Sequence, residues 1–81
     1  MASIPTEVDK IISSITGSLV NDFSATLNSL GITGGKLSEL ASQLDAFVNE
    51  KRPGASIGQD EITGDLTVQQ VIDIVSGVLD R

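Results

Sequence analysis

Apolar residues recur at helical spacing through the middle of the chain, and this spacing constrains the fold more than any other feature of the sequence. Between residues 37 and 48 they fall on one face of a helix, at Leu37, Leu40, Ala41, Leu44, Phe47 and Val48. Nowhere does the sequence sustain the alternation of polar and apolar residues that a half-buried strand requires. The pattern therefore predicts an all-α fold with this segment as its central helix.

A second apolar stripe follows Pro5, which suits the first turn of a helix. The stripe comprises Val8, Ile11, Ile12, Ile15 and Leu19, and its phase continues through Phe23, Leu27 and Leu30. Gly17 and the Ser/Thr/Asn-rich composition of 13–29 lower the helix propensity. Two outcomes are open: one helix from 5 to about 29, which the periodicity slightly favours, or a helix to about 16 followed by a partly helical loop.

Glycines at 31, 34 and 35 separate this region from the central helix, for which Thr33 is the expected N-cap. The helix should end at Lys51 or Arg52, because Pro53 disfavours helical geometry in the residue before it. Residues 53–64 are expected to form a loop with one short turn around Gln59 to Ile62, and with Ile57 and Ile62 anchored in the core.

The last helix carries a strong start signal. Thr67 as N-cap and Gln70 three residues later form the pattern of a capping box. Its predicted inner face consists of Val71, Ile72, Val75, Val78 and Leu79. Eighty-one residues suffice for one modest core, so we expect a single domain over 1–81, a small up-down bundle of three to four helices.

The composition excludes several functions. The chain has no Cys and no His, which removes thiolate metal sites and the usual nucleophile-base pairs, so we expect no catalytic activity of its own. Eleven acidic against five basic residues give a net charge of −6, which suits a protein partner with basic patches and disfavours nucleic acid. Without a long apolar run or a signal-like N-terminus, we expect no membrane span and a cytoplasmic location.

Three segments resemble acyl carrier proteins. Glu7-Val8-Asp9-Lys10-Ile11-Ile12 is similar to the family's first helix. Leu30-Gly31, then Glu39-Leu40 and Leu44-Asp45, resemble the pattern Leu-Gly-x-Asp-Ser-Leu, Glu-Leu, Leu-Glu. Residues 66–77, Leu-Thr-Val-Gln-Gln-Val-Ile-Asp-Ile-Val-Ser-Gly, look like the end of the family's last helix. These matches cover about half the chain in the right order, and the last is the most specific.

The resemblance implies a carrier that docks its central helix on partner enzymes, with Glu39 and Asp45 facing outward. In the family, a serine at the start of that helix carries 4′-phosphopantetheine, whose thiol holds the acyl group. Aligned from Leu30-Gly31, the family's Asp-Ser-Leu falls on Thr33-Gly34-Gly35, which offers no serine. Ser38 and Ser29 are the variant candidates for the attachment site, and otherwise they are ordinary surface residues.

A function of a different class is also open: a non-catalytic helical adaptor or oligomerising interaction module. The first helix discriminates between the two. A break near Gly17 with a long connection to Gly31 favours the carrier-like bundle, whereas an unbroken helix to Leu30 favours the adaptor. The sequence does not indicate an oligomeric state for either function.

Overall fold

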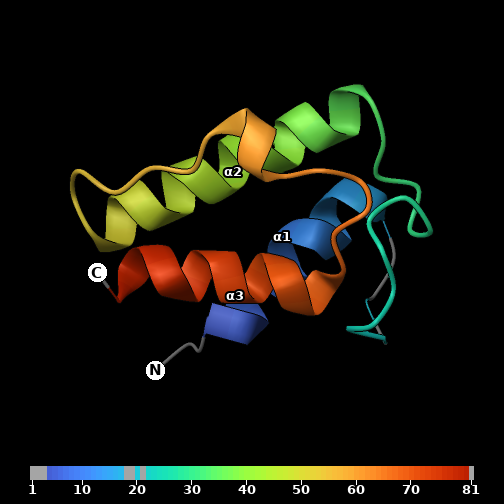
Figure 1. Cartoon of the computed structure of the whole chain (residues 1–81), viewed down its shortest axis with the longest axis horizontal. Helices are drawn as coiled ribbons and strands as arrows, with labels where there is room; N and C mark the ends of the chain where they lie inside the picture. The colour runs from blue at the N-terminus through green and yellow to red at the C-terminus, as the bar shows by residue number, and fades with distance from the viewer. Residues whose placement is uncertain (1–3, 18–19, 21, 81) are drawn as a thin grey trace.

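The computed structural model describes residues 4–17, 20 and 22–80, which form α-helices joined by loops (Figure 1). The elements are α1 (Ile4–Thr16), α2 (Gly35–Lys51), the short 3₁₀ helix η1 (Gln59–Glu61) and α3 (Val68–Leu79). Helix α1 contacts both α2 and α3, and these two also contact each other. The predicted small all-α bundle is confirmed.

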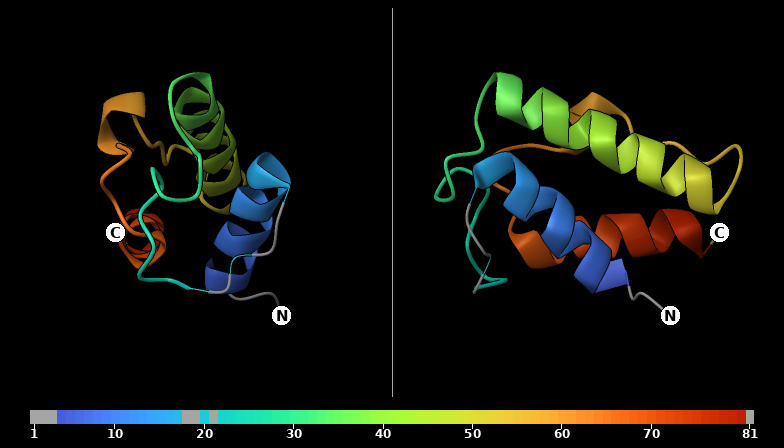
Figure 2. Two further views of the ribbon diagram at one scale, coloured as in Figure 1. Left: turned by 90° about the vertical axis from the view of Figure 1, so that its right-hand side faces the viewer. Right: turned by 180° about the vertical axis from the view of Figure 1, so that it is seen from behind.

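The helices do not simply alternate in direction. Figure 1 and Figure 2 show the chain leaving α2, passing back along that helix through η1, and entering α3 at the end of the molecule where α2 also starts. Helices α2 and α3 therefore run in the same direction, and α1 runs opposite to both. As a consequence, the C-terminal ends of α2 and α3 meet, and Arg52 Nη1 donates to the carbonyl oxygen of Val78 at 3.2 Å.

Helix α1 ends much earlier than its apolar periodicity favours. It stops at Thr16, and Gly17 follows with φ 76° and donates its N–H to Ser13 O at 2.8 Å. A glycine with positive φ is a common helix terminator, because this conformation strains residues with a Cβ. The expectation of one helix to about 29 is thus wrong, and the alternative of a helix to about 16 is correct. Leu19, expected on the same stripe, lies outside the described residues.

The described residues of the connection from α1 to α2 contribute to the core, although none of them is helical. Its later part pairs with the segment before α3: Leu27 N–H donates to Leu66 O and Val68 N–H donates to Ala25 O. Leu27 and Ile32 are fully buried. The connection is therefore held to α3 by backbone hydrogen bonds and to the core by apolar side chains.

The core is aliphatic and receives side chains from every element except η1. Its buried members are Val8, Ile12, Val20, Leu27, Ile32, Leu40, Ala41, Leu44, Val48, Ile57, Ile62, Val68, Val71, Ile72, Val75 and Val78. The predicted anchors Ile57 and Ile62 are among them, whereas Leu79 is only partly buried. The apolar stripes predicted along α1 and α2 thus face the same interior, and the burial of this apolar surface is the main source of the stability of the fold.

The predicted boundaries around the last loop agree with the structure. Helix α2 ends at Lys51 with Arg52 as its C-cap, and the short turn appears as η1. At α3, Thr67 Oγ1 accepts the N–H of Gln70 at 3.2 Å, and Gln70 Oε1 accepts the N–H of Thr67 at 2.9 Å. This reciprocal pair is the capping box that the sequence indicates.

Candidate functional site

The start of α2 lies where the carrier resemblance puts an attachment site. Its N-cap is Gly34 and not the expected Thr33, and Gly34 makes no side-chain capping bond. The Gly34 backbone has φ 56° and ψ −122°, a conformation open almost only to glycine. Gly34 is exposed, and its carbonyl accepts the N–H of Leu37 at 3.1 Å. The helix thus begins one residue later than predicted, and neither Gly34 nor Gly35 offers a hydroxyl.

Ser38 lies one turn into α2. Its backbone N–H donates to Gly34 O at 3.4 Å, and the residue is exposed. The Ser38 side chain thus lies on the solvent-exposed surface of α2. Ser38 therefore presents an accessible oxygen nucleophile, although not at the first position of the helix.

Ser29 lies in the connection before α2 and forms a local turn with Thr26. Its Oγ donates to Thr26 O at 2.8 Å, and its N–H donates to Thr26 Oγ1 at 3.2 Å. These bonds stabilise the turn that leads to Leu30-Gly31. The Ser29 hydroxyl is exposed but is oriented toward the backbone, so Ser29 and Ser38 occupy different kinds of position.

The two candidate docking carboxylates also differ. Glu39 is exposed on α2, and its Oε1 accepts Gln43 Nε2 at 3.4 Å, one turn along the same helix. Asp45, expected to face outward, is half-buried, and its Oδ1 accepts the backbone N–H of Ile57 at 2.9 Å. This bond fastens the returning loop to α2. Glu39 is therefore available to a partner, whereas Asp45 already stabilises the fold.

The contact made by the Arg52 side chain could not be predicted from the sequence. The pair Lys51-Arg52 is interpretable from the sequence as a helix end, and Arg52 is indeed the C-cap. The sequence gives no sign that its guanidinium reaches across to α3 and bonds Val78 O. That contact joins residues far apart in the chain, so no local pattern could have revealed it.

The turn before α3 carries one perturbed carboxylate. Thr63 Oγ1 donates to Asp65 Oδ1 at 2.6 Å. This bond, helped by a backbone hydrogen bond at Asp65 itself, lowers the pKa of the Asp65 carboxyl below its ordinary value, since both favour the charged form. The Asp65 side chain is exposed.

Replacing Thr63 with alanine should raise the pKa of Asp65 toward its ordinary value. A carboxyl whose pKa is lower in the folded state stabilises the fold at pH above its unfolded pKa, and this contribution is lost as the pH falls through the folded pKa. A ¹³C NMR titration of the side-chain carboxyl measures the change. An unaltered Asp65 pKa in T63A would mean that the hydroxyl is not the main cause of the shift.

Comparisons with known proteins give no family assignment. No protein-family model, curated protein or solved structure matches the chain significantly. Among the helices of the described residues, none is long and apolar enough to cross a membrane. Function must accordingly be inferred from the fold, the residues above and the resemblance of their pattern.

Proposed function

We propose that the chain is a divergent acyl-carrier-type protein that docks on partner enzymes through the N-terminal half of α2. One observation carries the proposal: α1 stops at Thr16, and a long connection over 17–34, which contains Leu30-Gly31, leads into α2 at Gly35. This is the arrangement that separates a carrier-like bundle from a helical hairpin. Gly34, on which the resemblance aligns the family's serine, is the N-cap of α2.

Charge supports a basic partner. The chain has a net charge of −6, and Glu39 projects from the exposed side of α2. Complementary charge accelerates encounter and fixes orientation at an interface more than it adds affinity. Asp45 is a weaker contributor to docking, because its Oδ1 already accepts the N–H of Ile57.

The residues at the start of α2 do not fit 4′-phosphopantetheine at the family position, since Gly34 has no oxygen to esterify. Of the two variant positions, Ser38 is the better candidate, because its side chain is on an exposed helix surface. The Ser29 hydroxyl already donates to Thr26 O. Docking on a partner enzyme and loading, which is the attachment of 4′-phosphopantetheine to a serine, are therefore separate parts of the proposal and need separate tests.

Docking is tested with a broad-specificity phosphopantetheinyl transferase, a partner enzyme of the family that the chain resembles. Titrated into the ¹⁵N-labelled chain, it should shift amide signals from Gly35 to Ala41. Glu39→Lys should weaken binding roughly tenfold, because reversal replaces an attraction with a repulsion, each on the order of 0.5–1 kcal/mol. The matched control is Glu50→Lys, an equal charge change on the exposed far end of α2. Equal weakening by both variants would contradict a local docking site.

Loading is tested in the same mixture after addition of coenzyme A. Intact mass followed by fragmentation would locate an adduct, which we expect only at Ser38 if the chain carries an arm, and S38A should then remove it. An unmodified chain that still binds the transferase would exclude the arm while leaving docking intact. A chain that neither binds nor gains mass would overturn the carrier proposal.

The second candidate function is a non-catalytic helical adaptor or oligomerising module. The absence of a hydroxyl at Gly34 favours this role, since a protein without an arm acts through its surface alone. The early end of α1 at Thr16 argues against the long helical hairpin that this role predicts. Light scattering over a concentration series separates the roles, because oligomerisation would raise the measured mass without any added enzyme.

A further inference from the structure

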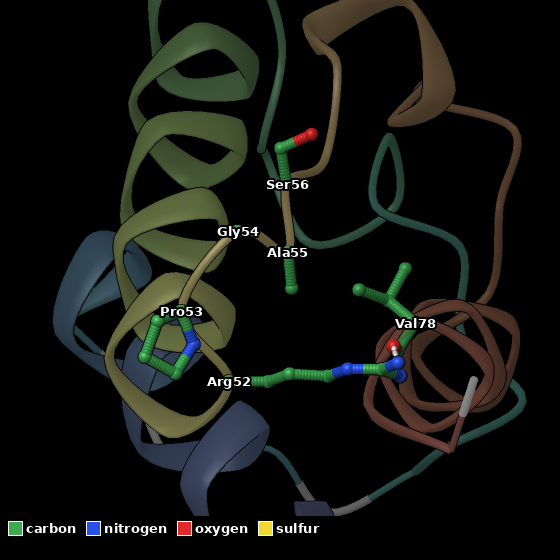
Figure 3. Close-up of a pocket in the computed structure, with 6 residues that line it drawn as sticks. All are labelled: Arg52, Pro53, Gly54, Ala55, Ser56 and Val78. Carbon is green, nitrogen blue, oxygen red and sulfur yellow. Dashed lines mark hydrogen bonds between the residues drawn. The ribbon is translucent and has the colours of Figure 1, made fainter.

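A cavity lies between the C-terminal ends of α2 and α3, away from the start of α2 (Figure 3). Its volume is about 310 Å³, at the lower end of the range for small-molecule sites. The lining residues are Arg52, Pro53, Gly54, Ala55, Ser56 and Val78. The cavity thus exists because the returning loop leaves α2 just where α3 ends.

Arg52 supplies the charge of this cavity. Its side chain extends along one wall, with the guanidinium beside Val78 (Figure 3). One nitrogen, Nη1, donates to Val78 O at 3.2 Å. Within the described part of the chain, no carboxylate forms an ion pair with Arg52. Since a guanidinium has five N–H donors and no acceptor, Arg52 retains donors for a further partner.

Two apolar side chains face the space next to the guanidinium, within a lining that is otherwise mostly polar. The methyl groups of Ala55 and Val78 point into the space above the guanidinium in Figure 3, whereas Pro53 lies farther away, near the start of the Arg52 side chain. Val78 is almost completely buried and Ala55 is half-buried, so their positions are set by the core. The cavity therefore combines one cation with a short apolar surface.

Hydrogen bonds hold the loop wall in place. Ala55 N–H donates to Arg52 O at 2.9 Å, closing a turn in which Gly54 has φ 94°. Asn49 Nδ2 donates to Ala55 O at 3.3 Å, and Asp45 fixes Ile57 two residues further on. A wall held at these points forms the cavity before a ligand arrives, which reduces the entropy cost of binding.

We propose that this cavity binds a small carboxylate with a short alkyl chain. The planar guanidinium matches the two oxygens of a carboxylate, and Ala55 and Val78 would cover the alkyl part. A ligand of this kind pairs with the free donors and also contacts the Ala55 and Val78 methyl groups, which a hydrated inorganic anion would not. The inference is independent of the carrier proposal, because it involves neither the start of α2 nor either serine.

The probe for this site is sodium butyrate, titrated into the ¹⁵N-labelled full chain at constant ionic strength. Saturable shifts are expected at the amides of Arg52, Gly54, Ala55 and Ser56. Butyramide, which has the same shape without the charge, should bind much more weakly. Shifts that do not saturate, or equal binding of butyramide, would overturn the proposal, as would tighter binding of inorganic phosphate than of butyrate.

Arg52→Gln should weaken butyrate binding roughly tenfold or more, because it removes a charge-assisted hydrogen-bond donor. Lys51→Gln is the matched control: it removes the same charge from the neighbouring residue, whose Nζ lies 5.7 Å from the Phe47 ring centroid and outside the cavity. Because Arg52 also bonds α3, a second variant, Ala55→Leu, keeps the guanidinium and fills the cavity. Butyrate binding to A55L at the affinity of the unaltered chain would overturn the assignment.

Discussion

Replacing Leu44 with alanine is expected to destabilise the fold by about 3 kcal/mol, within the range of roughly 2–5 kcal/mol for a buried leucine. Leu44 lies in the middle of α2 with no exposed surface. Its aliphatic neighbours cannot all move in to fill the space, so the loss of transfer free energy is added to the cost of a cavity. A domain of this length has a total stability of about 4–12 kcal/mol, so the loss is a large fraction of it.

Urea unfolding followed by circular dichroism at 222 nm measures this change as a lower transition midpoint. Ser42→Ala is the matched control, because Ser42 is exposed on the same helix and should alter stability by no more than about 0.5 kcal/mol. If L44A were as stable as S42A, the packing of α2 against α1 and α3 would differ from that described above.

Local signals in the sequence predicted most helix boundaries. The capping box at Thr67 and Gln70 depends on residues three positions apart, and the end of α2 depends on Pro53. Such signals are legible because the interacting groups are neighbours in the chain. The buried faces of α2 and α3 were predictable for the same reason, since helical periodicity decides which side chains share a face.

The end of α1 was misjudged because two local signals disagree. The apolar phase continues past Gly17, and Leu27, which belongs to that phase, is indeed buried. Leu27 lies in a loop, however, and its backbone N–H donates to the carbonyl oxygen of Leu66, far away in the sequence. Burial of the right residues therefore does not prove a helix, because long-range pairing can place them in the same core.

The candidate site likewise has features that the sequence could predict and features that it could not. The start of α2 could be predicted to within one residue, since Thr33 is the expected N-cap and Gly34 is the observed one. The inward role of Asp45 and the reach of Arg52 could not, since their partners Ile57 and Val78 are set by the path of the loop after α2. A charged residue is expected from the sequence to lie on the surface and to be available to another molecule, but the fold can give it a hydrogen-bond partner within the same molecule.

The double variant Thr33→Asp, Gly34→Ser is expected to accept phosphopantetheine from a transferase and coenzyme A at residue 34, where the unaltered chain has no hydroxyl. The substitution rebuilds the pattern that the resemblance places at the start of α2. Backbone amides at a helix N-terminus favour a phosphate group at this position. Intact mass and fragmentation would detect the adduct. Residue 34 should change from unmodified in the original chain to modified in most molecules of the double variant.

The backbone decides how easily the serine is accommodated. At φ 56° and ψ −122°, Gly34 has a conformation that costs a serine about 1–3 kcal/mol. No heavy atom of another segment lies within 4 Å of a Cβ built at Gly34, so the segment has room to change its dihedral angles. A serine N-cap in the usual extended conformation recovers about 1 kcal/mol. The double variant should therefore be slightly less stable than the unaltered chain but folded.

Gly35→Ser is the control for position, because Gly35 is also open to solvent but already lies within α2. It should add a hydroxyl without creating a substrate. An unmodified T33D/G34S chain with the helical spectrum and unfolding midpoint of a folded protein would show that the α2 start lacks the surface a transferase recognises. Loading of the double variant together with no loading of G35S would mean that the fold retains carrier geometry, and that the chain lacks only the residue that makes a carrier chemically active.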